Sequence, residues 1–124
     1  MSSSALFDQM RHSPVYEAWA EVAPDRKAFP ALIDKTGTLL RQRYDWRDEV
    51  RQLTTPTLLV YADADSFPTS NAAEFFALLG GGLTDGGVDG SGMSDMRLAI
   101  LPGRTHYNVL DSPLLLPVLT DFFA

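Results

Sequence analysis

The sequence predicts a protein of the α/β class, in which helices alternate with parallel strands. Two short and nearly continuous apolar runs, residues 57–61 and 97–101, are typical of strands that are buried on both faces. A helical pattern over residues 70–79 separates the runs, and a second helical pattern follows the later one. We therefore expect residues 52–124 to form a β-α-β-α unit with a parallel crossover.

Residues 1–51 show helical patterns instead of strands. A weak signal covers residues 5–11. Ser13 and Pro14 then indicate a helix N-cap and first helical residue, since the N–H that proline lacks would be unpaired there anyway. Its expected apolar stripe comprises Val15, Ala18, Trp19 and Val22. A further helix is expected from Phe29. Its inner face would comprise Leu32, Ile33, Thr36 and Leu40.

The remaining helix boundaries are marked by turn and cap residues. Asp45 is expected to cap a short turn over residues 46–51, after which we place an organisational boundary near Gln52. The helix between the strands is expected to begin at Ser70 or Asn71, whose side chains accept hydrogen bonds from first-turn N–H groups. Three glycines at positions 80, 81 and 82 end it. The dipeptide Ser112-Pro113 indicates the start of the last helix. Its buried stripe would comprise Leu115, Val118, Leu119 and Phe122.

The composition limits the classes of partner. A chain of 124 residues is long enough for one domain with a modest core. Its net charge of −6, without a basic cluster, disfavours nucleic acid. The absence of cysteine excludes disulfides and thiolate metal sites and suits a reducing compartment, so we expect a cytoplasmic protein. No apolar run approaches the ~20 residues of a membrane span, so we expect no membrane partner.

Seven of the nine glycines lie in residues 80–95, which predicts a flexible surface loop. The loop is not a phosphate-binding loop of the G-x-x-x-x-G-K-[ST] type, because it follows a helix, lacks that pattern and contains no lysine.

Chemically active residues follow both predicted strands. Asp63 and Asp65 come after the first, and His106 comes after the second. Ligands and catalytic groups in parallel sheets gather beyond the carboxyl ends of strands, and a carboxylate there can orient a histidine that acts as a base. We expect Asp65 to be the partner of His106, with Asp63 as the alternative. The interpretations without a functional role are a turn aspartate before Pro68 and a loop histidine. Two histidines without ligand spacing predict neither a metal site nor a cofactor.

Two motifs resemble those of the α/β-hydrolases. They are PTLLVYADAD at residues 56–65 and LPGRTHY at residues 101–107, and the last helix adds to the likeness. In that family a PTLLV-x-G-x-x-D strand brings the catalytic acid and a PGxxH turn brings the histidine. The resemblance implies that Asp65 and His106 belong to a Ser-His-Asp triad, while Asp63 occupies a position that is often acidic. Ala62 departs from the usual glycine. The spacing of 41 residues (106 − 65) is also longer than usual, and the glycine-rich loop accounts for the excess.

The nucleophile elbow of the family, G-x-S-x-G, does not occur in the sequence. Ser91 and Ser94 come nearest to it, but they lie in the glycine-rich loop, after the acid. The resemblance thus implies a partial α/β-hydrolase fold, in which residues 1–51 form a helical lid-like segment and residues 52–124 form the C-terminal β-α-β-α part of the core.

Three functions compete at this stage. The first is an ester or related acyl hydrolase whose nucleophile lies on another polypeptide, so that this chain is inactive alone and meets its small-molecule acyl substrate only when completed. The second is a truncated hydrolase product without catalysis. The third is a binding or interaction protein. In each case we expect a homo-oligomer, because two strands leave an open edge and apolar faces.

Overall fold

The computed structural model describes residues 8–124. The chain divides into two compact units, Met1–Tyr44 and Asp45–Ala124, and each is considered by itself. The short helix α4 (Arg47–Arg51) lies in the second unit, where it contacts α5 (Thr69–Leu78). The boundary that the sequence suggested near Gln52 thus lies at the far end of α4. The helix expected over residues 5–11 begins outside the described residues.

The first unit contains α2 (Pro14–Val22), the 3-10 helix η1 (Arg26–Ala28) and α3 (Phe29–Leu40). The expected start of α2 is confirmed, because the Ser13 side chain accepts a hydrogen bond from the backbone N–H of Tyr16 at 3.3 Å and Pro14 is the first helical residue. The expected start of α3 at Phe29 is confirmed as well. The sequence signals for the starts of α2 and α3 therefore hold.

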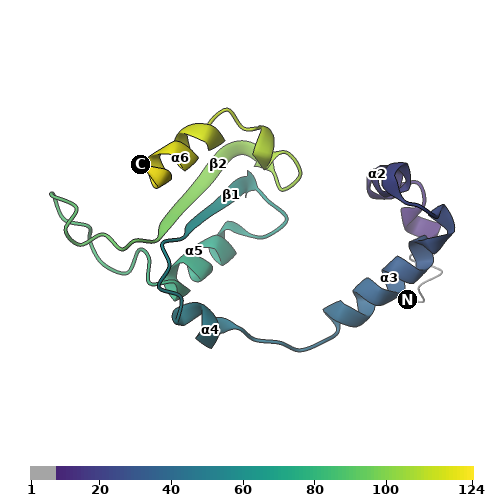
Figure 1. Ribbon diagram of the computed structural model, residues 1–124, viewed down its shortest axis with the longest axis horizontal. Helices are drawn as coiled ribbons and strands as arrows, with labels where there is room; N and C mark the ends of the chain where they lie inside the picture. The colour runs from purple at the N-terminus through teal and green to yellow at the C-terminus, as the bar shows by residue number, and fades with distance from the viewer. Residues whose placement is uncertain (1–7) are drawn as a thin grey trace. The chain divides into compact units, whose positions relative to one another are not determined.

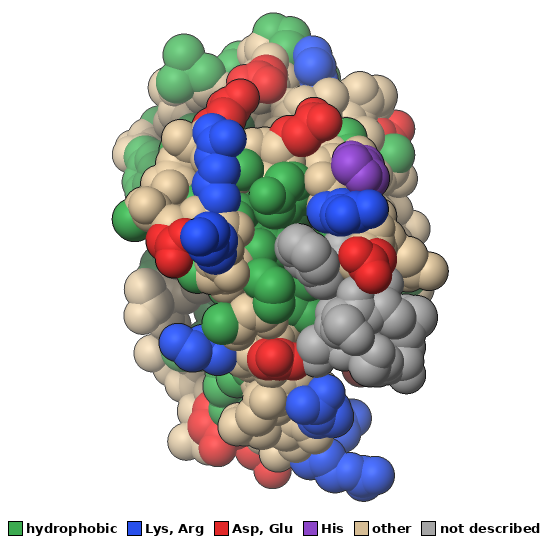
Figure 2. Space-filling view, turned by 90° about the vertical axis from the view of Figure 1, so that its right-hand side faces the viewer, with side chains coloured by type: hydrophobic (Ala, Val, Ile, Leu, Met, Phe, Trp, Pro, Cys, Tyr) green, Lys and Arg blue, Asp and Glu red, His purple; other side chains and the backbone are tan. Residues whose placement is uncertain are grey.

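The apolar stripes expected for α2 and α3 are mostly exposed, which corrects the sequence-based expectation. Phe29 is buried, and its ring lies 4.9 Å from the rings of both Tyr16 and Trp19, measured between centroids. In contrast, Val22 and Leu40 are 81% and 72% exposed. Two short helices have too few neighbours to enclose both stripes. Figure 2, which views the molecule from the right-hand side of Figure 1, shows hydrophobic side chains at the surface.

Part of the exposed surface forms an open apolar cavity of about 280 Å³ within the first unit. It is lined by Met10, Val15, Phe29, Leu32, Ile33, Thr36, Gly37 and Leu40. The predicted inner face of α3 thus lines a cavity and is not packed into a core.

The second unit contains the sheet. After α4 come β1 (Leu58–Ala64), α5 and β2 (Arg97–Thr105), followed by the 3-10 helix η2 (Val109–Asp111) and α6 (Leu115–Phe123). β1 and β2 pair in parallel, so the α/β class and the β-α-β-α order are confirmed for the described residues. In this view α5 lies beside β1 and α6 beside β2 (Figure 1).

Both helices pack against the sheet. Ala99 and Leu98 of β2 line a cavity together with Val118 and Phe122 of α6. Leu98 also lines a second cavity with Phe76 of α5. Ala62, Ala72, Leu101, Leu79 and Met96 are the buried apolar residues of this unit.

Both strands extend beyond their apolar runs, and their register becomes irregular at the carboxyl ends. Pairing proceeds regularly from Leu58 opposite Arg97 to Ala62 opposite Leu101. The next pair is Ala64 opposite Thr105, so residues 102–104 face a single residue of β1. Gly103, with φ of 67°, adopts the left-handed conformation that this bulge requires.

The helix ends in this unit show where local signals fail and where they hold. α5 begins at Thr69 after Pro68, without a side-chain cap, so the start expected at Ser70 or Asn71 is wrong. Its expected end is confirmed, because Gly80 has φ of 86° and the N–H of Gly81 donates to the carbonyl of Phe76 at 2.9 Å. α6 begins at Leu115, two residues later than expected.

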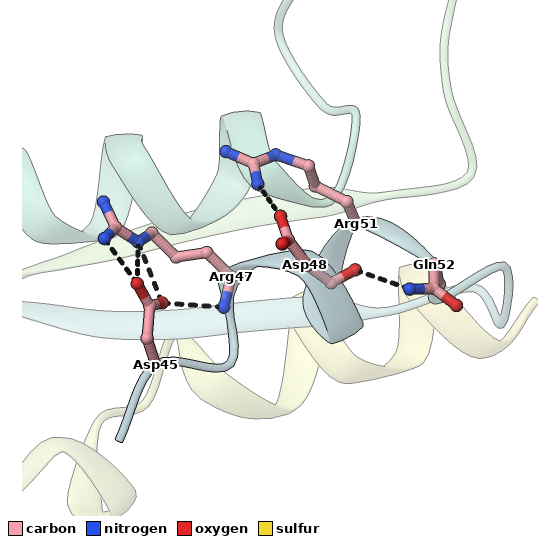
Figure 3. Close-up of polar contacts among 5 residues, drawn as sticks. All are labelled: Asp45, Arg47, Asp48, Arg51 and Gln52. Carbon is pink, nitrogen blue, oxygen red and sulfur yellow. Dashed lines mark hydrogen bonds and ion pairs between the residues drawn. The ribbon is translucent and has the colours of Figure 1, made fainter. Parts of the chain in front are cut away.

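Asp45 organises the entry to α4, as expected from the sequence. Its carboxylate accepts hydrogen bonds from the backbone N–H of Arg47 at 3.1 Å and from the Nε of the same arginine (Figure 3). The Arg47 guanidinium lowers the pKa of Asp45 to about 2. A neighbouring ion pair joins Arg51 to Asp48 at 2.6 Å. Exposed pairs of this kind contribute little to stability, so they act mainly as local turn contacts.

Among residues 8–124, no helix has the length and apolar character needed to cross a membrane.

Candidate functional site

Asp65 and His106 meet at the carboxyl ends of the two strands. Asp65 directly follows β1 and His106 directly follows β2. The distance between Oδ1 of Asp65 and Nδ1 of His106 is 3.0 Å, which is within hydrogen-bond range. The proximity expected from the strand-end positions is therefore confirmed. The two side chains differ in burial: that of Asp65 is 5% exposed, and that of His106 is 52% exposed.

Backbone N–H groups fix the Asp65 carboxylate. Oδ2 accepts a hydrogen bond from the N–H of Ala62 at 3.2 Å, and Oδ1 accepts one from Phe67 at 3.4 Å. Desolvation acts to raise the pKa of Asp65, but these N–H groups and His106 outweigh it and hold the pKa below its usual value. Asp65 is therefore an ionised acceptor with a fixed orientation.

The orientation of the His106 ring leaves one nitrogen open. Because Nδ1 faces an ionised carboxylate, the neutral ring is assigned its proton on Nδ1, and Nε2 carries the lone pair. The rings of Phe67 and Tyr107 meet the imidazole edge to face, at centroid distances of 6.2 and 5.7 Å. Within residues 8–124 no hydrogen bond engages Nε2. This nitrogen can accept a proton from an incoming group.

Asp63 has a different partner, which resolves the alternative that the sequence left open. Its Oδ1 accepts a hydrogen bond from the backbone N–H of Arg104 at 3.1 Å. The backbone N–H groups of Gly103 and Arg104 lower the pKa of Asp63. Asp63 thus contacts the bulge of β2, and Asp65 contacts the histidine ring.

The sequence analysis did not identify Asn108 as part of this site. Its Oδ1 accepts hydrogen bonds from the backbone N–H of Thr105 at 2.7 Å and from the Thr105 hydroxyl at 3.2 Å. These contacts close the turn that carries His106. The signal for it is an asparagine shortly after a predicted strand, a common turn residue whose side chain binds nearby backbone groups.

The serines nearest to the nucleophile pattern are not at this site. Ser94 lies before the amino end of β2, where its Oγ accepts a hydrogen bond from the N–H of Met96 at 3.3 Å. The nine residues of β2 separate that end from His106. At about 3.3 Å per residue, this separation is roughly 30 Å. Ser91 precedes Ser94 in the same loop. Neither serine is positioned to react with His106.

A cavity of about 480 Å³ also lies away from the Asp65–His106 pair. Its lining includes Leu58, Arg97 and Phe122, which places it between α6 and the amino ends of the strands. It is therefore not a substrate pocket for the histidine. In the described part of the chain, no cluster of three or more His, Asp or Glu side chains is arranged to hold a metal ion.

The arrangement has the chemistry of a base and its orienting acid. Comparison with known proteins gives no match to this chain among protein-family models, curated proteins or solved structures.

Proposed function

We propose that this chain supplies the acid and the general base of a serine-hydrolase-type site, in a partial α/β-hydrolase fold that acts on esters or related acyl compounds. The observation that carries the proposal is the 3.0 Å contact between Oδ1 of a buried Asp65 and Nδ1 of an exposed His106. The motifs around the two residues support it. The cysteine-free composition suits a cytoplasmic location for the assembled enzyme.

The roles follow from the geometry. Nε2 of His106 takes the proton of a serine hydroxyl as that oxygen attacks the acyl carbon, and it later gives the proton to the leaving group. Asp65 holds the tautomer that leaves Nε2 free and stabilises the imidazolium that forms. The N–H groups of Ala62 and Phe67 keep the carboxylate in place during both steps.

The proposal assigns the nucleophile to a second polypeptide. The sequence contains no G-x-S-x-G, and the His106 side chain is about half exposed, so a partner has access to the ring. Removing the nucleophile of a serine hydrolase costs about 10⁶ in kcat. We therefore expect the chain alone to hydrolyse an activated aryl ester no faster than free imidazole at the same concentration.

The test combines this chain with a polypeptide that carries G-x-S-x-G and is encoded beside it. A fluorophosphonate reagent, which labels activated serines, is applied to each chain alone and to the mixture. We expect labelling of the partner only in the mixture and its loss with His106→Ala. Labelling of the partner that persists when His106→Ala is used would overturn the proposal. Labelling of this chain by itself would place the nucleophile within it.

Residues 1–51 are assigned to a lid-like role in the same proposal. Their helices α2, α3 and α4 and the open apolar cavity of the first unit support it, because an apolar lid surface suits acyl chains. Deleting the first unit should weaken binding of long-chain acyl substrates more than binding of acetyl esters.

The second candidate is a non-catalytic interaction protein that forms a homodimer. The observation that favours it is the edge of β1, an apolar strand that pairs only with β2 in the described part of the chain. Such an edge can pair with another strand. Light scattering at micromolar concentration should then show a dimer. A monomer with a cooperative melt would count against it.

A further inference from the structure

Two aspartates at the carboxyl end of β1 form hydrogen bonds with different residues at the end of β2. Asp63 is the penultimate residue of β1, and Asp65 directly follows the strand. Asp65 contacts the ring of His106, while Asp63 accepts a hydrogen bond from the backbone of Arg104. Arg104 is two residues before His106. The Asp65 carboxylate therefore binds the His106 ring, and the Asp63 carboxylate binds the backbone just before that residue.

The segment that Asp63 contacts is the irregular part of β2. Three residues, 102–104, bulge opposite Asp63 and leave the regular pairing of the two strands. Pro102 has no N–H to donate, and Gly103 is the residue type with the greatest backbone freedom. The contact from Asp63 to Arg104 spans this bulge at 3.1 Å. On the other side of the histidine, Asn108 holds Thr105.

We propose that Asp63 is a positioning residue, which fixes the bulged end of β2 so that the His106 ring stays against Asp65. This inference rests on the proposed role of His106 as the base. Asp63 does not touch the ring and takes no proton in the reaction. It acts through the backbone of Arg104, and Asn108 provides the second anchor of the same turn.

The bulge is only partly buried, which predicts a specific phenotype. Arg104 is half-buried, so water can replace the Asp63 carboxylate at its N–H. Loss of the carboxylate should leave the second unit folded but allow the turn and the ring to move. The pairing of His106 with Asp65 is then the quantity that changes.

The experiment measures the ratio of the two neutral tautomers of His106 by ¹⁵N NMR, at a pH where the ring is uncharged. In the wild-type chain we expect the Nδ1–H form to dominate. Asp63→Ala should lower the ratio of the Nδ1–H form to the Nε2–H form about fivefold, the value of one typical hydrogen bond. Asp63→Asn keeps an acceptor oxygen and should restore the wild-type ratio. Asp89→Ala is the matched control, since Asp89 also accepts a backbone N–H bond, from Ser91 at 3.1 Å, in the distant glycine-rich loop.

An unchanged tautomer ratio in a folded Asp63→Ala variant would overturn the inference. Should that variant not fold, amide hydrogen exchange of Arg104 in the wild-type protein gives the decision. Protection of this amide supports the contact, and exchange at the rate of an unstructured peptide refutes it. Neither readout uses a partner chain or turnover. A failed fluorophosphonate test would therefore overturn the proposed function while the tautomer result still decides the position of the ring.

Discussion

The two ends of the sheet use the same side chain in different ways. At the amino end of β2, within the glycine-rich loop, Asp85 and Asp89 accept hydrogen bonds from Gly87 and Ser91, each two residues further along. At the carboxyl end, Asp63 and Asp65 accept hydrogen bonds from residues that are 41 positions away. The loop aspartates close local turns. The strand-end aspartates join two segments of the chain.

This difference shows what converts a turn residue into a candidate site. Aspartate favours turns because its short side chain reaches nearby backbone N–H groups. Asp65 also accepts a local hydrogen bond of this kind, from the N–H of Phe67. It contacts His106 in addition because β1 and β2 run in parallel and end together. The chemistry of the site comes from strand pairing added to an ordinary turn. Four experiments test the contrast between the two ends.

The largest effect is expected for Asp65→Asn at the carboxyl end. Loss of the charge removes the support for the imidazolium, and an amide can present its NH₂ group to the ring and so favour the wrong tautomer. In serine hydrolases the equivalent change lowers kcat about 10⁴-fold. The rate of fluorophosphonate labelling in the two-chain mixture should fall to a similar degree. Asp89→Asn, at the amino end, should leave that rate unchanged, and an equal loss in both variants would erase the contrast.

The next effect is on stability and compares an apolar residue from each end. Leu101 is buried beside the bulge, so Leu101→Ala should cost about 2–5 kcal/mol, from lost burial and a residual cavity. Val88 in the loop is fully exposed, and Val88→Ala should stay within about 0.5 kcal/mol. Urea unfolding followed by circular dichroism measures both changes. Equal midpoints would mean that the loop is as well packed as the strand end.

Two glycines give a matched pair with equal cost and different consequences. Gly103 and Gly90 have φ of 67° and 75°, and a Cβ atom at either position would meet no atom closer than 3.5 Å. Alanine at each site should therefore lose about 1–2 kcal/mol through backbone strain alone. Only Gly103→Ala should also shift the tautomer ratio of His106. A shift caused by Gly90→Ala would show that the loop and the site are coupled.

The smallest effect is the pH dependence of the two backbone contacts. Backbone N–H donors lower the pKa of Asp63, and the side chain and backbone of Ser91 lower that of Asp89. A lowered carboxyl pKa means that the stabilising charge is fully present above the ordinary pKa of 3.8 and is lost as pH falls through the folded value. The protection of the Arg104 and Ser91 amides against hydrogen exchange, relative to the intrinsic exchange rate at each pH, should therefore fall on acidification. Asp63→Asn should remove the pH dependence at Arg104 alone, and a persistent dependence there would implicate another group.

The sequence by itself determined the features that depend on neighbouring residues. The Ser13 cap of α2, the start of α3 at Phe29 and the Gly80 end of α5 follow from local backbone chemistry. The two apolar runs determined the strands, and the residues after them marked Asp63, Asp65 and His106 as candidates. Local rules failed where a nearby alternative was available, as at the start of α5 after Pro68.

The sequence favoured Asp65 over Asp63 as the partner of His106, and tertiary structure decided between the two. That choice depends on the register of the two strands and on the bulge at residues 102–104. With this register, the backbone of Arg104 meets Asp63 and the ring of His106 meets Asp65. Tertiary structure also decided that the stripes of α2 and α3 stay largely exposed, because burial depends on the number of packed neighbours and not on helical spacing. Both outcomes rest on contacts between distant segments, whose energies no local pattern records.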